Sequence, residues 1–160
     1  MMDEFKKLLI KYDSGILYKS LENEHDPNGH SFPITLPRKK LILPNSKDSD
    51  PFGWAAKCIE EFRNHRPYIL IPGTSFDLYG TRHGRGGGWY DRFLSKVPAE
   101  WLRIGVADKS QISKTRLEKK DWDQSVNWIL VFDKSTWKAH LCEMPESDRR
   151  PMLGKHQFYH

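Results

Sequence analysis

The chain has 160 residues, of which 38% are hydrophobic, with six Trp and eight Phe and a net charge of +5. This composition excludes a disordered chain and predicts one globular domain over residues 1–160, long enough to bury a core. Because no apolar stretch approaches the ~20 residues of a membrane span and no signal-peptide pattern is present, we expect a cytoplasmic protein that does not bind membranes.

The first third of the sequence predicts little regular structure. Residues 3–12 have the periodicity of an amphipathic helix. Residues 15–50 are rich in proline and predict turns, with a short strand at 39–43. We therefore expect residues 1–50 to form a divergent N-terminal segment of the domain. At the other end, the polar residues 145–160 predict a flexible tail.

Beyond this segment, helical and strand patterns alternate along the chain. The expected elements are a helix at 53–64, a strand at 67–72, a helix at 88–96, and strands at 102–107, 126–132 and 136–141. Such alternation is typical of a mainly parallel sheet that is flanked by helices. The sequence therefore predicts an α/β fold.

A glycine-rich loop, RHGRGGGWYDR from Arg82 to Arg92, leads directly into the helix expected at 88–96. Glycine lets backbone N–H groups approach an anion closely, and a helix N-terminus adds partial positive charge. The side chains of Arg82, Arg85 and Arg92 add planar cations. Asp91 supplies carboxylate oxygens of the kind that Mg²⁺ prefers. The loop therefore predicts a site for phosphate and a divalent cation.

On pattern alone, two other interpretations of this loop stay open. Its glycines do not complete a dinucleotide fingerprint, because the third glycine would fall on Trp89, and no P-loop Gly-Lys-Ser/Thr follows. The alternatives are a flexible surface loop and an RNA-binding segment in which Arg85 and Trp89 stack on bases. The apolar strand before the loop and the amphipathic helix after it favour the phosphate loop, since open α/β sheets bind ligands at the carboxyl ends of their strands.

Several motifs follow one another in a fixed order within residues 69–132. They are IPGTSFD from Ile71, Gly80, RHGRGGGWYDRFL from Arg82, GVA from Gly105, and Gln111. In order and spacing these motifs resemble the 5-formyltetrahydrofolate cyclo-ligase family, also called methenyltetrahydrofolate synthetases. The resemblance implies a three-layer α/β fold, ATP and Mg²⁺ as cofactors, and a reduced folate as substrate.

The resemblance also implies roles for single residues. Those expected to bind ATP are Arg82, Gly84, Arg85, Gly86, Gly87, Gly88, Trp89, Tyr90 and Asp91. Among them Arg85 would face the terminal phosphate, and Trp89 and Tyr90 would flank the substrate. Arg85 and Tyr90 are the expected catalytic residues. Asp91 and Asn127 are the expected metal ligands.

In the family's reaction the formyl oxygen attacks the γ-phosphate of ATP. The second folate nitrogen then closes on the activated carbon and expels phosphate, which gives 5,10-methenyltetrahydrofolate. No covalent enzyme intermediate is needed, so the protein supplies alignment and charge neutralisation.

Two departures from the family pattern accompany this resemblance. Asn127 falls where relatives carry a carboxylate, and its neutral amide predicts weaker Mg²⁺ binding, with Asp121 and Asp123 as nearby alternatives. The family's first helix, which carries basic residues for ATP, has no convincing counterpart. Lys6 and Lys7 could do this work, or they are solvated lysines of an amphipathic helix.

Three functional hypotheses follow from these observations. The first is a cyclo-ligase that acts on 5-formyltetrahydrofolate, and the second is a cyclo-ligase-like protein with a different ligand or without turnover. The third is a basic RNA-binding module. Because the basic residues are spread along the chain without a nucleic-acid-binding motif, we do not expect nucleic acid as a partner. We expect a monomer that binds small molecules.

Overall fold

The computed structural model describes residues 1–45 and 49–144, so the tail expected at 145–160 lies outside the described residues. The helices are α1 (Met2–Leu9), α2 (Pro51–Glu61) and α3 (Trp89–Lys96), and a 3₁₀ turn, η2, covers Lys109–Gln111. The strands are β1 (Ser14–Tyr18), β2 (Lys39–Leu43), β3 (Pro67–Ile71), β4 (Ser75–Phe76), β5 (Arg82–His83), β6 (Leu102–Asp108), β7 (Trp128–Asp133) and β8 (Thr136–Leu141).

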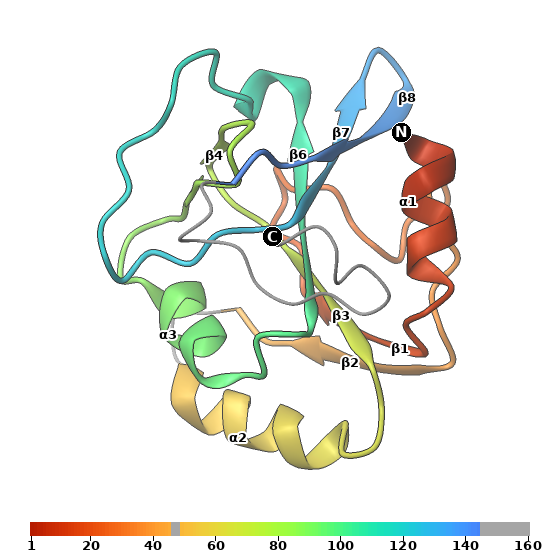
Figure 1. The fold of residues 1–160 in the computed structure, drawn as a ribbon, viewed down its shortest axis with the longest axis vertical. Helices are drawn as coiled ribbons and strands as arrows, with labels where there is room; N and C mark the ends of the chain where they lie inside the picture. Colours follow the sequence, from red (N-terminus) through yellow and green to blue (C-terminus); the bar gives the residue numbers. More distant parts are fainter. Residues whose placement is uncertain (46–48, 145–160) are drawn as a thin grey trace.

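The centre of the molecule is a six-stranded sheet in the order β2-β1-β3-β6-β7-β8. The strands β2, β1, β3, β6 and β7 run parallel to their neighbours, and β8 returns antiparallel to β7. Figure 1 shows α1 on one side of this sheet and the pair α2 and α3 on the other. The predicted α/β fold, with a mainly parallel sheet flanked by helices, is confirmed.

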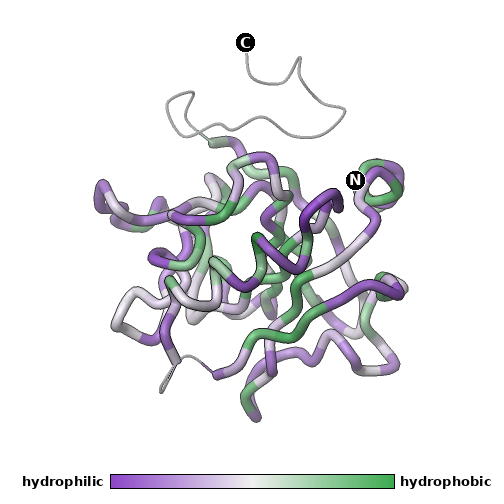
Figure 2. Tube along the Cα trace, turned by 90° about the horizontal axis from the view of Figure 1, so that it is seen from below, coloured by the Kyte–Doolittle hydropathy of each residue, from purple (hydrophilic) through white to green (hydrophobic). Residues whose placement is uncertain are grey.

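Two hydrophobic cores lie on opposite faces of the sheet, because successive residues of a strand point to opposite sides. On β3, Ile69 and Ile71 belong to the core that α2 and α3 cover, and Tyr68 and Leu70 belong to the core that α1 covers. Figure 2 shows the hydrophobic stretches gathered at the centre and the hydrophilic ones on the outer loops. The three layers therefore follow from burial on both faces of one sheet.

Strand β1 was not predicted, because its sequence contains a glycine and lies in the proline-rich first third of the chain. All five of its residues are buried between β2 and β3. Glycine normally weakens a strand, but here the ring of Tyr68 covers Gly15, and a Cβ at this position would lie 2.9 Å from that ring. Residues 14–18 are therefore an inner strand of the sheet.

Helix boundaries differ from expectation by a few residues at each end. Helix α2 begins earlier than predicted because Asp50 caps it and accepts a hydrogen bond from the Phe52 N–H at 3.1 Å, with Pro51 in the first turn. Helix α1 ends at Leu9, three residues short of the predicted end. Among the described residues, no helix has the length and apolar character needed to cross a bilayer.

The glycine-rich loop lies at the carboxyl edge of the sheet, where the parallel strands end. After β3 the chain forms a small antiparallel hairpin of β4 and β5 before it reaches the glycines. No strand was expected between the strand at 67–72 and the helix at 88–96, but the structure has two short ones there. The turn of this hairpin is fixed by Asp77, whose carboxylate accepts N–H bonds from Tyr79, Thr81 and Leu117 at 2.8–3.0 Å.

Candidate functional site

Three consecutive glycines form the open part of the loop. Gly86, Gly87 and Gly88 have φ angles of +91°, +74° and +64°, the left-handed region that side-chain-bearing residues avoid. A Cβ at any of the three would meet nothing within 4 Å. Among the hydrogen bonds of residues 1–45 and 49–144, none uses the N–H of these glycines as donor. The loop therefore has backbone donors that no described residue uses, next to open space where side chains would otherwise lie.

Arg82 lies beneath this loop and is only 7% exposed. Its Nε–H donates a hydrogen bond to the carbonyl of Pro72 at 2.6 Å, and its guanidinium lies 4.9 Å from the centre of the Tyr90 ring. A Cβ on Gly84 would come within 2.9 Å of this guanidinium. Burial lowers the pKa of Arg82, and the charges of Asp91 and other nearby groups oppose that shift. Arg82 is thus a cation held rigidly under the loop.

Arg85 stands on the exposed side of the same loop. Its Nη2 donates to the Asn23 side-chain oxygen at 2.9 Å and lies 3.8 Å from a carboxylate oxygen of Glu24. The Glu24 side chain is 9% exposed, whereas that of Arg85 is 45% exposed. Asn23 and Glu24 belong to the turn-rich first third, where no sequence pattern singles them out. The structure therefore adds two residues to the site that the sequence analysis missed.

Asp91 lies in the first turn of α3 and accepts the Gln124 N–H at 2.8 Å. Burial raises its pKa, and the neighbouring Asp123 carboxylate raises it further, while the Gln124 hydrogen bond and Arg82 act in the opposite direction. Two carboxylates brought together in this way suit a divalent cation, which would neutralise their mutual repulsion. Asp123, an alternative ligand in the sequence analysis, is thus the carboxylate beside Asp91.

Asn127 has a different set of neighbours from those expected of a metal ligand. Its Oδ1 accepts the Arg103 N–H at 2.9 Å, and its own N–H donates to the Arg103 carbonyl at 2.8 Å. The residue is 1% exposed, and among the described residues its hydrogen bonds lead to Arg103 and Cys142, not to Asp91. These bonds fix the chain just after Gln124 and Asp123. The structure therefore makes Asn127 a support for the segment beside Asp91.

Trp89 and Tyr90, expected to flank the substrate, are 6% and 8% exposed. The Trp89 indole is stacked on Phe93 with ring centres 5.5 Å apart, and its N–H donates to the Ser49 carbonyl at 3.0 Å. An indole buried in this way presents no face for a nucleic-acid base, which weakens the RNA-binding hypothesis. The contacts of Trp89 and Tyr90 with a ligand stay predictions.

The other basic candidates lie apart from the loop or on its outer side. Lys6 and Lys7 are exposed on α1, which packs in the core on the face opposite to α3. Arg92 is exposed on α3. His83 is engaged with the carbonyl of Glu118 at 2.7 Å. The structure thus brings Arg82, and not these lysines, close to Asp91.

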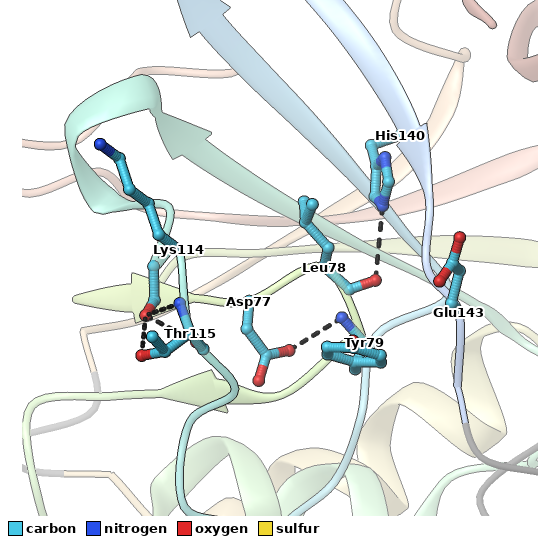
Figure 3. A pocket seen from close by; sticks show the side chains of 8 residues that line it. Asp77, Leu78, Tyr79, Lys114, Thr115, His140 and Glu143 are labelled. Carbon is cyan, nitrogen blue, oxygen red and sulfur yellow. Dashed lines mark hydrogen bonds between the residues drawn. The ribbon is translucent and has the colours of Figure 1, made fainter.

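A separate hollow of about 140 Å³ lies between the Asp77 turn and the end of β8. Figure 3 shows Lys114, His140 and Glu143 around it, with Asp77 bonded to the Tyr79 N–H and His140 to the Leu78 carbonyl. None of the glycine-loop residues lines this hollow. Its best-buried acidic group, Asp77, is used by the backbone of the hairpin turn.

A family model described as the 5-formyltetrahydrofolate cyclo-ligase family matches residues 56–132, a range that runs from α2 to β7 and contains the whole glycine loop. Over these residues the chain is similar to this cyclo-ligase family. The matched range holds Asp91, Asp123 and Asn127, whereas Asn23 and Glu24 precede it.

Two solved 5,10-methenyltetrahydrofolate synthetases are similar to the chain. That from Mycoplasma pneumoniae is 17% identical, with 81% of this chain and 87% of that chain covered and a TM-score of 0.48. That from Aquifex aeolicus, determined by NMR, is 21% identical, with 100% of this chain and 91% of that chain covered and a TM-score of 0.48.

Proposed function

We propose that this chain is an ATP-dependent cyclo-ligase that converts 5-formyltetrahydrofolate to 5,10-methenyltetrahydrofolate, with release of ADP and phosphate. The observation that carries the proposal is the row of left-handed glycines, Gly86 to Gly88, whose N–H groups have no partner among the described residues. Backbone donors in open space bind phosphate oxygens, and Arg82 and Arg85 supply positive charge on either side. The match of residues 56–132 to the cyclo-ligase family supports the same proposal.

The two arginines contribute to this site in different ways. Arg82 is buried and held by the Pro72 carbonyl, so it supplies a fixed positive charge. Arg85 is half exposed, and among the described residues its side chain bonds to the segment that contains Asn23 and Glu24. Because this side chain can turn from Asn23 to a phosphate oxygen, we assign Arg85 to the terminal phosphate of ATP.

Asp91 and Asp123 are the residues that fit a bound Mg²⁺. Their carboxylates lie side by side, and burial together with that repulsion raises the pKa of Asp91. When bound, Mg²⁺ supplies charge neutralisation at the phosphates. Asn127 would contribute by holding the segment that carries Asp123, through its bonds to Arg103. Its proposed direct contact with the metal would require its Oδ1 to leave the Arg103 N–H.

The reaction needs alignment more than acid–base chemistry. The formyl oxygen bonds to the γ-phosphorus as the bond to ADP breaks. The second folate nitrogen then bonds to the formyl carbon and gives up its proton to water, and phosphate leaves with its electron pair. Burial raises the pKa of the Tyr90 hydroxyl, which keeps it protonated as a hydrogen-bond donor for the substrate. Glu24, beside Arg85, offers a carboxylate that can accept N–H bonds from a reduced pteridine ring.

The proposal is tested by mixing the protein with 5-formyltetrahydrofolate and Mg-ATP and following the absorbance of the methenyl product. We expect absorbance to rise with the wild type and to stop rising with Arg85→Ala. Arg92→Ala is the matched control, because it removes an exposed arginine of the same segment and should leave the rate unchanged. Tight binding of Mg-ATP without turnover would favour a cyclo-ligase-like protein with a different ligand, and absence of nucleotide binding would overturn the proposal.

A further inference from the structure

The segment between β1 and β2 crosses the carboxyl edge of the sheet. We call residues 19–32 of it the crossing segment. It leaves the end of β1, contacts Arg85 through Asn23 and Glu24, and contacts the ends of β6, β7 and β8 through His25. It contains neither helix nor strand, so its position depends on these contacts and on that of Phe32 with Trp137, whose ring centres lie 5.4 Å apart.

His25 makes the most extensive of these contacts. Its Nε2 lies 3.3 Å from Oδ1 of Asp108, the last residue of β6. Its ring centre is 5.0 Å from that of Phe132 on β7 and 5.0 Å from that of Trp137 on β8. The backbone carbonyl of His25 accepts the hydroxyl of the buried Tyr18. One residue therefore ties the crossing segment to four strands of the sheet.

Asp108 is a rigid partner for His25. Its Oδ2 accepts the N–H and the hydroxyl of Ser110 at 3.1 Å and 2.8 Å, and the backbone bond lowers its pKa most. The Gln111 side-chain oxygen accepts a hydrogen bond from the Asp108 N–H at 2.9 Å, and the Gln111 side-chain nitrogen donates one to the Gly73 carbonyl at 2.9 Å. The anchor of His25 is thus a charged carboxylate fixed to the loop that follows β3.

The residues before His25 reach the glycine loop. A tight turn joins the Leu21 N–H to the Glu24 carboxylate at 2.8 Å and the Glu24 N–H to the Leu21 carbonyl at 3.0 Å. This turn holds the Glu24 carboxylate and the Asn23 amide toward Arg85. Any movement of His25 away from Asp108 would carry both side chains with it, since Glu24 is its direct neighbour.

We infer that His25 is a positioning residue, which holds Asn23 and Glu24 against the glycine loop by binding Asp108 and packing against the rings of Phe132 and Trp137. The inference rests on the proposed function as far as substrate is concerned. Without His25 the crossing segment is ordered only when substrate binds. The conformational entropy lost in that ordering weakens substrate binding, while the reacting groups stay the same. The effect should therefore appear in KM and not in kcat.

A second histidine–aspartate pair provides the matched control. His65 Nδ1 lies 3.2 Å from Oδ2 of Asp13, with side chains 37% and 41% exposed, against 28% and 44% for His25 and Asp108. This control pair lies at the opposite, amino edge of the sheet, next to the starts of β1 and β3. It has the same chemistry and similar exposure, but it contacts no residue of the crossing segment among the described ones.

The experiment compares the wild type with His25→Ala, His25→Phe and His65→Ala. Amide hydrogen exchange at Leu21 and Glu24 reports the order of the crossing segment, and KM and kcat for 5-formyltetrahydrofolate report its effect on the site. We expect exchange about tenfold faster in His25→Ala and the wild-type rate in His65→Ala. His25→Phe should give an intermediate rate, because it keeps a ring against Phe132 and Trp137. KM should rise about tenfold in His25→Ala with kcat within about twofold.

Wild-type exchange rates in His25→Ala would overturn the inference, and so would an equal acceleration in His65→Ala, which would indicate general destabilisation. A fall in kcat with unchanged KM would also contradict it. The exchange measurement needs no substrate. If the wild type shows no turnover, the proposed function fails, and exchange at Leu21 and Glu24 still decides whether His25 positions the crossing segment.

Discussion

Two aspartates at opposite edges of the sheet, Asp13 and Asp91, differ in how their charge is compensated. At the amino edge, Asp13 accepts bonds from the Arg66 N–H at 2.8 Å, the Ser14 hydroxyl at 2.9 Å and His65 at 3.2 Å. Burial alone would raise its pKa, but these bonds outweigh burial, and the pKa of Asp13 is lowered. At the carboxyl edge, burial raises the pKa of Asp91, which lies beside a second carboxylate.

This difference separates structural polar groups from those available to a ligand. The amino edge satisfies its charges internally and so contributes to the stability of the fold. At the carboxyl edge Asp108 is likewise satisfied, by Ser110 and His25. No described residue, however, uses the N–H groups of the three glycines, and Asp91 is under-compensated, so a phosphate and a cation would complete this edge. This unused hydrogen-bonding capacity, and not the number of charges, supports the proposal that the carboxyl edge binds the ligand.

The two aspartates also have opposite effects on stability as pH changes. Because the pKa of Asp13 is lower in the folded protein than in the unfolded chain, Asp13 stabilises the fold at pH values above 3.8, the unfolded pKa. This stabilisation is lost as pH falls through the folded pKa. Because the pKa of Asp91 is raised, the native state holds a proton that the unfolded chain has released at pH values between 3.8 and the folded pKa. Asp91 therefore lowers stability as pH rises from 3.8 through its folded pKa.

The largest expected effect comes from Asp91→Asn. The amide oxygen can still accept the Gln124 N–H, while the repulsion with Asp123 disappears, so the melting temperature without ligand should stay constant or rise. Turnover with Mg-ATP should fall about 100-fold, as expected when charge stabilisation in a transition state is lost. Initial rates at varied Mg²⁺ and thermal unfolding measure the two effects.

Asp121→Asn is the matched control for this substitution. Asp121 is exposed, and it is the other alternative ligand named from the sequence. The Asp121→Asn substitution should leave turnover unchanged. Undiminished turnover in Asp91→Asn, or a large fall in its melting temperature, would show that Asp91 is a structural residue like Asp13.

Asn127→Asp tests whether position 127 belongs to the structural or the functional group. The side chain is 1% exposed and bonded to Arg103, so a carboxylate there would be a buried charge, and we expect a loss of about 3 kcal/mol in the free energy of unfolding. Urea unfolding at neutral and acidic pH measures this loss, which should shrink where the new carboxyl is protonated. Tighter Mg²⁺ binding with unchanged stability would contradict the structure and place position 127 beside the metal.

Gly86→Ala tests whether the left-handed loop binds nucleotide. The new Cβ meets no atom within 4 Å, so the only effect is backbone strain at a φ of +91°, about 1–2 kcal/mol. We expect Mg-ATP to bind about tenfold more weakly by calorimetry. Gly53→Ala in α2 is the control, because φ there is not positive and the nearest neighbour of its Cβ, the capping Asp50 carboxylate at 3.0 Å, is far from the glycine loop in sequence. Equal affinity in both variants would argue against a binding loop.

Asp13→Asn has the smallest expected effect and concerns only the amino edge. The side chain is 41% exposed, so after allowance for solvent screening the loss in unfolding free energy is at most about 1 kcal/mol at neutral pH. Because the lowered pKa is removed, acid should destabilise the variant less steeply than the wild type. Turnover should not change. Urea unfolding across a pH series measures the difference, and reduced turnover would mean that the two edges are coupled.

The sequence predicted the elements whose signal is local. Strands β3, β6 and β7 are apolar runs that stand out between turn signals, and α3 shows its amphipathic spacing. Strand β1 escaped because Gly15 interrupts its pattern, and only a residue far along the chain, Tyr68, explains the glycine. The hairpin of β4 and β5 escaped because strands of two residues are too short to show periodicity.

The candidate site divides in the same way. Arg82 to Asp91 are neighbours in sequence, and their spacing, together with the strand before them and the helix after them, favoured a phosphate site. Glu24 joins them only through the fold, and nothing in its own sequence surroundings indicates it. Asp123 was named from the sequence only as an alternative ligand, and the fold brings it beside Asp91. Asn127 was expected as a metal ligand from its position in the chain. The direction of its side-chain amide depends on the backbone of Arg103 on the neighbouring strand β6, which the sequence around Asn127 does not show.

Calorimetric titration of the wild-type protein with ATP, with Mg²⁺ and again with a chelator, tests most directly whether the carboxyl edge is the binding edge. We predict one nucleotide per chain, bound more weakly when Mg²⁺ is removed. Folded protein that takes up no nucleotide in the presence of Mg²⁺ would contradict this account.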